Sequence, residues 1–439
     1  MPGYGRHPGV RLYLAISKRL LHTLDMSAEK DRLPSELTWV ERSVGGKPVA
    51  GLPSESKIQF PVQMDSFRVD KRTNGQGSSF LHSAESRLLI ACAGRVASPQ
   101  KIRQLLRADL EWEWILGRAV DYGTAPAMYC SLKNSAPEQL IGTEIMARLH
   151  SLYRRSCVEQ INASGKLKEI LLAFSRVGIA VIVLKGAALA ELVYHGLGLR
   201  TMLDLDLLVR KADLDLADDV LRQLGYVPDE SYQSREWYRE HHHHLAPYVA
   251  GDRSLVLEVH HHVVPTVAPV SLAIDDFWQR ARPAQIASVP ALVLSPQDLL
   301  LSICIHLCAR QYFVRTLRDL SDIAATIAVY GAELDWDRLV REATTYEASR
   351  CLYYSLWLAH CIVEAPLPPR LLNSLKAAAG IGRTRDHCLK FLALRAVFPG
   401  LTIIPAGFIG DAIRELLYPK FAGGTVAMLS KWIGQRSKT

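Results

Sequence analysis

Hydrophobic residues recur at helical spacing along most of the chain from Ser83 onward, with polar residues in between. Before the middle of the chain this periodicity predicts helices over 87–97, 101–107, 112–121, 138–158 and 167–177, and after it over 213–224, 299–309, 315–329, 336–346 and 349–363. The first eighty residues contain one amphipathic stretch, 10–24, followed by sequence rich in Pro, Gly, Ser and Lys. We expect 29–79 to be poorly ordered.

The middle of the chain has a different pattern, with short apolar runs bounded by turn residues. One run over 179–184 ends at Gly186 and is followed by a helical segment, 187–194, which predicts strand, tight turn and helix. A second strand is expected at 203–209. Segments 242–249 and 254–264 read as a hairpin around a turn at 250–253. The predicted order is therefore helices, a small mixed sheet, then helices.

Two aspartates interrupt the apolar run at 203–209. Alternation along a strand places Asp204 and Asp206 on the same face. A buried carboxylate is costly unless it is paired or binds a metal, so two on one face favour a divalent cation. Glu258 is a third acid in an apolar strand, at 255–260. Carboxylates arranged in this way suit phosphoryl or nucleotidyl transfer.

Length and composition set wider bounds. The 439 residues are 49% hydrophobic and 22% charged, which describes a globular protein of two or three lobes. The net charge of +8 suits a phosphorylated ligand, but the basic residues are spread out, so nucleic-acid binding is not indicated. No apolar segment is long enough to predict a membrane span, and no signal peptide is visible. We therefore expect a cytoplasmic protein with eight reduced cysteines.

The order of these motifs carries a family resemblance. The strand ending in Lys185-Gly186, the sequence Gly-Leu-Arg-x-x-x-Asp-x-Asp-x-Leu-Val at 198–209 and the Glu-Val-His at 258–260 resemble the uncharacterised nucleotidyltransferase family of the polymerase β-like superfamily. The likeness extends upstream to 114–116 and 124–129, and downstream to 294–300 and 318–322. It covers roughly residues 83 to 370. A metal-dependent nucleotidyltransferase with Mg²⁺ or Mn²⁺ as cofactor is what this resemblance implies.

The same resemblance implies roles for individual residues. Asp204 and Asp206 would hold the metal, with Glu258 as the third acid that ligates it or activates the incoming hydroxyl. Lys185, Gly186 and Ala187 would face the triphosphate, although Ala187 stands where the superfamily usually has a second glycine or a serine. Arg200, four residues before Asp204, could also contact phosphate as a fixed charge.

The fold implied is α+β, a small mixed β-sheet nucleotidyltransferase core flanked by N- and C-terminal helical lobes. Its expected boundaries are an extension at 1–80, a helical lobe at 83–164, the core at 165–290 and a second helical lobe at 291–439.

The reaction implied moves a nucleoside monophosphate from a nucleoside triphosphate to an unidentified hydroxyl-bearing acceptor, a small molecule or a peptide, and releases pyrophosphate. Two alternatives stay open. One is a phosphotransferase or kinase-like enzyme acting on a peptide or sugar product with the same acids. The other is a catalytically degenerate binding or antitoxin-like protein, which the departure at Ala187 favours and the presence of all three acids opposes.

Three further residues are candidates for the site: His260, Arg318 and Asp322. Arg318 and Asp322 lie four residues apart on a predicted helix, so we expect them to form an ion pair. His260 belongs to one of two histidine runs, 241–244 and 260–262, on the paired segments. Strand alternation would turn neighbouring histidines to opposite faces, so that a metal site or a phosphate-contacting patch could use only some of them.

Overall fold

The structure, a computed structural model, describes residues 83–93, 99–135, 138–202, 204–264, 270–398 and 406–418. The extension expected at 1–80, with its amphipathic stretch at 10–24, lies outside these residues. In chain order the described elements are α2 (Ala84–Ala93), α3 (Pro99–Leu105), α4 (Trp112–Asp121), α5 (Ala125–Ser135), η5 (Glu138–Leu140), α6 (Thr143–Arg176), β1 (Ile182–Val183), α7 (Lys185–Leu189), η6 (Ala190–Tyr194), β2 (Leu205–Leu208), η7 (Lys211–Asp213), α8 (Leu214–Gln223), β3 (Val227–Pro228), α9 (Arg235–His241), β4 (Tyr248–Val249), β5 (Val256–His260), α10 (Ile274–Arg280), β6 (Arg282–Ile286), β7 (Val289–Val293), α11 (Pro296–Ile305), η8 (His306–Arg310), α12 (Leu317–Tyr330), α13 (Trp336–Thr345), α14 (Ser349–Val363), α15 (Leu371–Ala379), α16 (Arg383–Val397) and α17 (Ala406–Leu417).

The architecture is α+β, as the sequence predicts. Seven strands form one mixed sheet in the order β3-β4-β5-β2-β1-β7-β6. The β2–β5 and β1–β7 pairs are parallel, and the other neighbours run antiparallel. The hairpin expected across 250–253 is present as β4 and β5, with shorter strands than predicted. The edge hairpin of β6 and β7 was not predicted.

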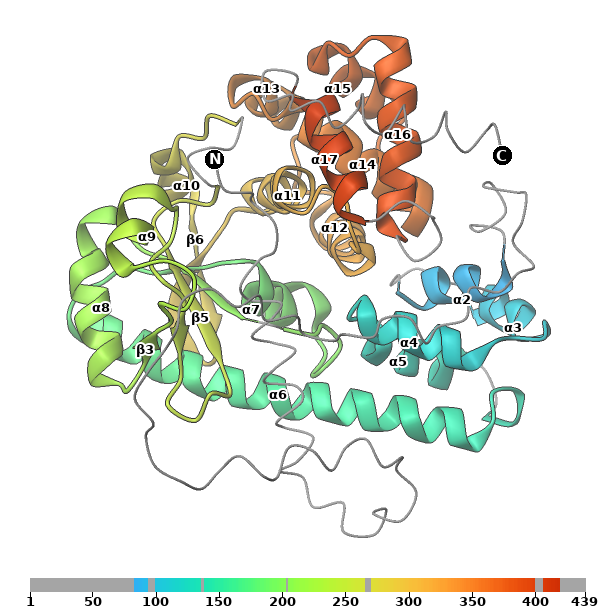
Figure 1. Ribbon diagram of the computed structural model, residues 1–439, viewed down its shortest axis with the longest axis horizontal. Coiled ribbons are helices and arrows are strands. Elements are labelled where there is room, and N and C mark those ends of the chain that lie inside the picture. Colours follow the sequence, from blue (N-terminus) through green and yellow to red (C-terminus); the bar gives the residue numbers. More distant parts are fainter. Residues whose placement is uncertain are drawn as a thin grey trace, which may run out of the picture. The chain divides into compact units, whose positions relative to one another are not determined.

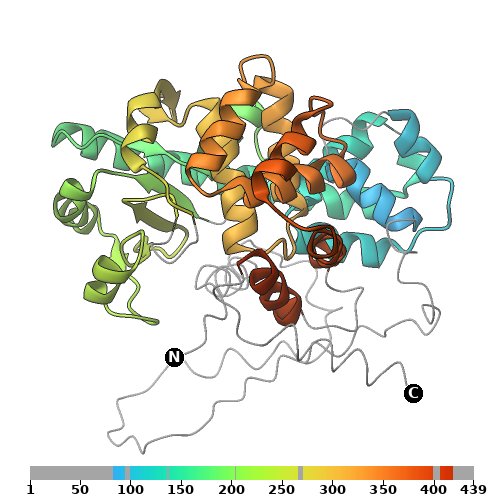
Figure 2. The same cartoon turned by 90° about the horizontal axis from the view of Figure 1, so that it is seen from above.

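The long helix α6 connects the sheet to the N-terminal helices. It packs against α5 on one side and against α8 and β7 on the other, so that the sheet and helices α2–α5 lie at opposite ends of it (Figures 1 and 2). The sequence predicted two helices with a break before residue 167, whereas α6 is continuous through Gly165. A glycine inside a helix costs about 1 kcal/mol, which the packing of buried residues such as Ala163 and Leu167 outweighs.

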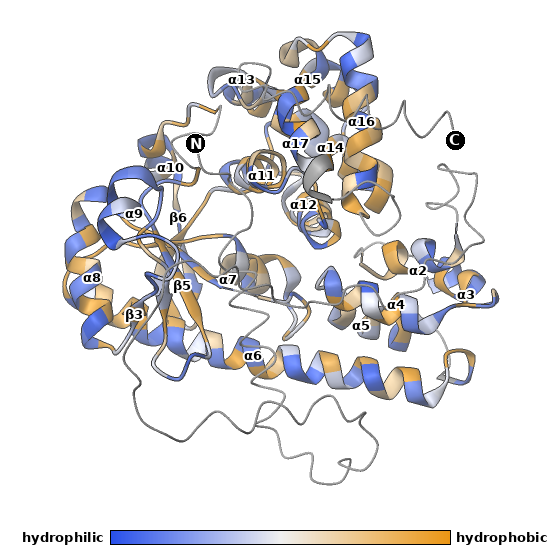
Figure 3. Ribbon diagram, in the orientation of Figure 1, coloured by the Kyte–Doolittle hydropathy of each residue, from blue (hydrophilic) through white to orange (hydrophobic). Residues whose placement is uncertain are grey.

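Alternation along the strands divides the sheet into two faces. Leu205 and Leu207 of β2 join Leu257 of β5 in a hydrophobic cluster with α6 and α8. Leu208 belongs instead to a second cluster, built mainly from the helices on the other side of the sheet. Figure 3 shows hydrophobic stretches in the sheet interrupted by hydrophilic ones, whereas α6 alternates between hydrophilic and hydrophobic residues along its length. Both faces of the central strands are therefore covered.

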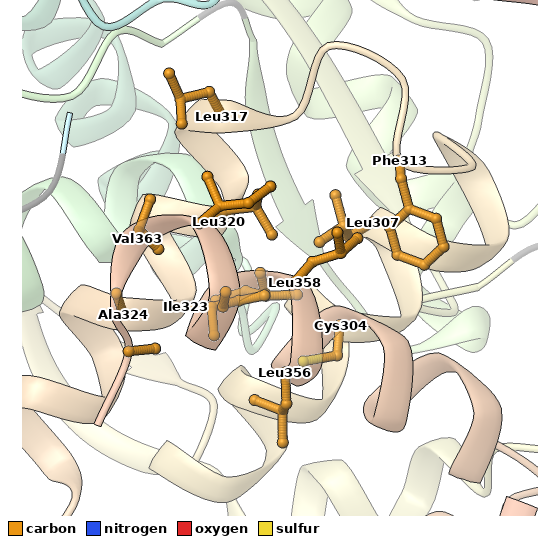
Figure 4. Packing of buried hydrophobic residues seen from close by; sticks show 14 of the residues in the cluster. Cys304, Leu307, Phe313, Leu317, Leu320, Ile323, Ala324, Leu356, Leu358 and Val363 are labelled. Carbon is orange, nitrogen blue, oxygen red and sulfur yellow. The ribbon is translucent and has the colours of Figure 1, made fainter. Parts of the chain in front are cut away.

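The second cluster forms the helical core. Cys304 and Leu307 from α11 and η8 pack with residues of α12 and α14, including Leu320 and Leu358 (Figure 4). Cys308 is also fully buried there, as expected for a core thiol. Two predicted helices have the observed bounds, α4 and α14. Among the described helices, none combines the length and apolar character needed to cross a membrane.

Candidate active site

The parallel pairing of β2 and β5 brings two of the predicted acids together. Asp206 lies opposite Glu258 in the register, and Leu208 lies opposite His260. Leu207 and Val259, which flank these acids along the strands, point into the cluster with α6 and α8. Alternation therefore turns Asp206 and Glu258 to the face that the helical core covers.

His260 holds the two carboxylates together. Its Nε2 lies 3.0 Å from Oδ1 of Asp206 and 3.4 Å from Oε2 of Glu258. Glu258 and His260 are buried and Asp206 is half-buried. One side-chain atom from each of the three lies within 4.8 Å of the other two. Asp204 comes immediately before β2 and is also half-buried.

The electrostatics of the two aspartates differ. Burial, followed by repulsion from Asp206 and Glu258, raises the pKa of Asp204 to about 7. Burial also opposes ionisation of Asp206, but the hydrogen bond and charge of His260 outweigh it and lower the pKa of Asp206. Burial likewise disfavours a charged His260, yet its hydrogen bonds to Asp206 and Glu258 raise the pKa of His260 to about 9. In the absence of a cation, a protonated imidazole offsets part of the acids' charge.

Three basic residues face these acids from three different elements. Lys185 begins α7, where burial lowers its pKa despite the attraction of Asp206 and Asp204. Arg310 ends η8, where burial also lowers its pKa although Glu258 and Asp206 oppose that effect. Arg318, in the first turn of α12, acts electrostatically on Asp204. The site therefore combines carboxylates, which could hold a metal, with cations, which could bind phosphate.

Sequence reasoning missed Arg310. It belongs to η8, a π-helical turn that directly continues α11. Such turns are rare and occur frequently at functional sites. The periodicity of the apolar residues predicts one uninterrupted helix there, and a change from α- to π-helical hydrogen bonding leaves little trace in the sequence. A second π-helical turn, η6, follows α7.

Gly186 has a packing role in this turn. A Cβ atom at Gly186 would lie 3.3 Å from Nη1 of Arg200 and 3.7 Å from the carbonyl oxygen of Asp204. Glycine therefore allows the loop that enters β2 to approach α7 closely. Ala187 is buried in the cluster shared with α6 and α8, so only its backbone could face a phosphate.

The predicted ion pair between Arg318 and Asp322 is wrong. Asp322 is bound instead by Arg200, whose Nε and Nη2 lie 2.8–3.1 Å from the two carboxylate oxygens, and by the hydroxyl of Tyr194 at 2.8 Å. Arg318 lies 3.8 Å from Asp319. Sequence spacing identifies a pair within one helix, but it cannot identify an arginine that arrives from a loop more than a hundred residues away.

Gly198 positions the loop that carries Arg200. Its φ of +73° is in the left-handed region, and a Cβ atom there would lie 2.5 Å from Sγ of Cys157 on α6. The carbonyl of Gly198 accepts a hydrogen bond from Ser156 at 2.8 Å, and its amide donates to Gln160 at 2.6 Å. The first part of the motif at 198–209 thus fixes the loop on α6 and pairs Arg200 with Asp322. The second part contains Asp204 and Asp206.

The histidines after α9 do not alternate as strand residues would. The rings of His242, His243 and His244 contact one another, with centroids 4.0–4.8 Å apart. Regular pairing in β4 begins only at Tyr248, and His244 makes an isolated bridge to His260. Because this segment is not a regular strand, consecutive side chains can lie on the same side.

The residues of the acid site fit a hard divalent cation. Carboxylate oxygens are the ligands that Mg²⁺ and Mn²⁺ prefer, and Asp206 and Glu258 converge with Asp204 adjacent to them. Lys185, Arg310 and Arg318 add positive charge without supplying further ligands. Without a ligand, these acids destabilise the core, because burial and mutual repulsion oppose their ionisation.

Carboxylates that meet on neighbouring strands could hold a metal ion that assists phosphoryl or nucleotidyl transfer. A sequence model described as an uncharacterised nucleotidyltransferase matches residues 108–364. The chain belongs to this family, and its enzyme class is that of a transferase, in agreement with the resemblance of the motifs. No curated protein and no solved structure matches the chain.

Proposed function

We propose that the protein transfers a nucleoside monophosphate from a nucleoside triphosphate to a hydroxyl group, with Mg²⁺ or Mn²⁺ held by Asp204, Asp206 and Glu258. The parallel register that sets Asp206 opposite Glu258 carries this proposal, because it joins two acids that are far apart in the sequence. The family match supports the class of reaction. The metal, the acceptor and the product are parts of the proposal.

The proposed reaction exchanges one bond at the α-phosphorus for another. The acceptor oxygen forms a bond to the α-phosphorus while the bond from that phosphorus to the bridging oxygen breaks, and pyrophosphate leaves. A bound divalent cation supplies charge neutralisation and orientation of the reacting oxygens. Glu258, which lies beside Asp206 on the same face, would accept the proton of the acceptor hydroxyl.

The basic residues would bind the phosphates. Lys185 and Arg310 interact electrostatically with the acids from α7 and η8, and both are desolvated. A desolvated cation binds an anion more strongly than an exposed one, because water screens it less. Arg318 lies near Asp204 from α12. Arg200, whose Nε and Nη2 bind Asp322, would position Gly186 and the loop before β2 and contact phosphate only through its remaining nitrogen.

The products of slow nucleotide hydrolysis distinguish this reaction from phosphoryl transfer without knowledge of the acceptor. When water replaces the acceptor, nucleotidyl transfer gives nucleoside monophosphate and pyrophosphate, whereas phosphoryl transfer gives nucleoside diphosphate and phosphate. We expect the first pair of products with Mg²⁺ or Mn²⁺ and one of ATP, GTP, CTP or UTP. Diphosphate and phosphate would identify a phosphotransferase instead.

The matched control is an aspartate outside the site. Asp219→Asn changes an exposed acid on α8 and should leave the products and rate unchanged, whereas Asp206→Asn should abolish them. If neither nucleotide binding nor turnover can be detected with wild-type protein, the proposed reaction is wrong and a binding protein with this fold is favoured.

A further inference from the structure

A second cluster of ring nitrogens lies beside the acids and takes no part in the proposed reaction. His242, His243 and His244 each contribute one nitrogen, and the three nitrogens lie within 4.8 Å of one another. His243 is 4% exposed and His244 is 2% exposed. Three possible metal ligands of the same chemical type are therefore gathered in a largely buried place.

Several ring nitrogens of the described histidines in and beside this cluster have no hydrogen-bond partner. Among the described residues, Nδ1 of His242, Nδ1 of His243 and Nε2 of His244 are buried without one, as is Nδ1 of His260. A buried polar atom left in this state is destabilising, because it has lost its hydrogen bonds to water without replacement. Nearby His262 shows the alternative, since both of its ring nitrogens have backbone partners: Nε2 lies 3.1 Å from the carbonyl oxygen of Leu272 and Nδ1 lies 3.0 Å from that of Val264.

The tautomer of His244 gives a second, independent argument. Its Nδ1 lies 2.6 Å from the carbonyl oxygen of Leu245, and because a carbonyl can only accept, Nδ1 carries the hydrogen. The neutral ring then presents the lone pair of Nε2, which lies 3.6 Å from a carboxylate oxygen of Glu258. Two electron-rich atoms face each other there. Histidines that bind metals characteristically donate their other N–H to a carbonyl or a carboxylate, as His244 does.

We propose that His242, His243 and His244 bind one transition-metal cation of the Zn²⁺ class, separate from the Mg²⁺ or Mn²⁺ of the acid site. Imidazole nitrogens select Zn²⁺, Co²⁺, Ni²⁺ or Cu²⁺, whereas Mg²⁺ prefers oxygen ligands. Tetrahedral coordination with Zn–N distances of about 2.0–2.1 Å requires nitrogens about 3.3 Å apart, whereas the three nitrogens lie within 4.8 Å of one another, so binding would turn the rings toward a common centre.

The charges around the cluster are mixed. Arg310 acts electrostatically on all three histidines and opposes a further cation. Glu258 acts in the opposite sense on His242 and His244. The backbone holds the segment on β5, because the amides of His261 and His262 both donate to the carbonyl of His243. A cation bound here would fix the segment between α9 and β4 against the strand that carries Glu258.

The test measures metal binding by the full chain after chelator treatment and dialysis. We expect one Zn²⁺ per chain by equilibrium dialysis, retained in excess Mg²⁺, and a visible absorption of tetrahedral Co²⁺ when Co²⁺ replaces it. His243→Ala and His244→Ala should each weaken Zn²⁺ binding by more than about 100-fold, because losing a ligand costs more than the roughly 10–100-fold loss of a group that only supports a ligand. His241→Ala is the matched control, because it removes an exposed histidine of the same run and should leave the affinity unchanged.

Further variants distinguish loss of a metal ligand from loss of folding, and the histidine site from the acid site. If His244→Ala does not fold, as judged by circular dichroism, the double variant His242→Gln, His243→Gln replaces it and should show the same loss. Asp204→Asn with Asp206→Asn should lose Mg²⁺-dependent nucleotide binding and retain Zn²⁺. The inference is overturned if wild-type protein binds no Zn²⁺, if the histidine variants bind it as tightly as wild type, or if the aspartate variant loses it.

Discussion

Asp322 and Asp206 are both held by a basic partner inside this protein, but in different ways. Asp322 accepts hydrogen bonds from two nitrogens of Arg200 and from the hydroxyl of Tyr194. Asp206 shares a single imidazole, His260, with Glu258. The first arrangement neutralises one carboxylate with one guanidinium. The second leaves more acidic groups than its imidazole can neutralise, with Asp204 next to them.

This difference suggests a structural role for Asp322 and a ligand-binding role for Asp206. A carboxylate with a complete set of partners holds elements together, here the loop after η6 and α12. Several carboxylates lie close together on one face of the sheet, and basic residues from three other elements lie near them. Such a site suits a ligand that carries both positive and negative charge. A metal-bound nucleoside triphosphate carries both a cation for Asp206 and Glu258 and phosphates for Lys185 and Arg310.

The largest effect is expected when the site acid is neutralised. Asp206→Asn should lower the rate of pyrophosphate release by about 10³-fold or more, because preorganised charge supplies most of the catalysis in this type of transfer. Steady-state kinetics with the preferred nucleotide measures it. A loss smaller than tenfold would show that Asp206 does not hold the metal.

Neutralising the structural acid should instead affect stability. Asp322→Asn leaves Arg200 buried without its anion, which costs about 3–5 kcal/mol of unfolding free energy. Chemical denaturation measures the change. Replacing both residues together, as Arg200→Met with Asp322→Leu, should recover much of it, since no unpaired charge remains. If Asp322→Asn unfolds at the same denaturant concentration as wild type, the pair is not structural.

Removing a basic residue that faces the acids should weaken triphosphate binding. Lys185→Met should raise the dissociation constant of the nucleotide by about 10–100-fold, as expected for one charged hydrogen bond of about 1.5–3 kcal/mol. Lys185→Arg should restore part of it. Lys168→Met, at an exposed position on α6, is the matched control and should bind normally. Equal binding by both Met variants would exclude Lys185 from the phosphate site.

Asp204 should add a pH dependence. Because the pKa of Asp204 is raised to about 7 in the folded protein, its protonated form stabilises the fold below about pH 4. That stability is lost as the pH rises through 7. Metal-free wild type should therefore lose thermal stability across this range relative to Asp204→Asn. Mg²⁺ affinity should rise over the same range, because the metal binds the ionised carboxylate. Parallel pH profiles for the two proteins would contradict the assignment.

The sequence predicted the class of fold, most of the long helices and the acids on the sheet, because these follow from local periodicity and from the cost of burying charge. It could not predict the partners that tertiary structure brings together. Asp322 was expected to pair with Arg318, whereas in the structure it pairs with Arg200, which the sequence had suggested only as a phosphate contact. The two-residue strand β1 and the edge hairpin β6–β7 carry too little pattern to be bounded from sequence alone.

The candidate metal site was predicted from acids that are close in the sequence. Asp204 and Asp206 are two residues apart, and the predicted strand would place them on one face, whereas β2 begins at Leu205 and leaves Asp204 directly before it. Arg310 was missed because a π-helical turn redirects it toward the acids without changing the apolar pattern. The alanine at position 187, where the superfamily usually has a glycine or a serine, has a physical explanation. Its side chain is buried in the hydrophobic cluster beneath the sheet, so a hydroxyl there would point into apolar surroundings.

The central claim is that Asp204 and Asp206 bind a nucleoside triphosphate through a divalent metal. Isothermal titration of ATP, GTP, CTP and UTP, with and without Mg²⁺, into wild type, Asp219→Asn and the Asp204→Asn, Asp206→Asn double variant tests it most directly. The account predicts Mg²⁺-dependent binding of at least one nucleotide by the first two proteins and none by the double variant. Equal nucleotide binding by all three proteins, or binding that does not require Mg²⁺, would contradict it.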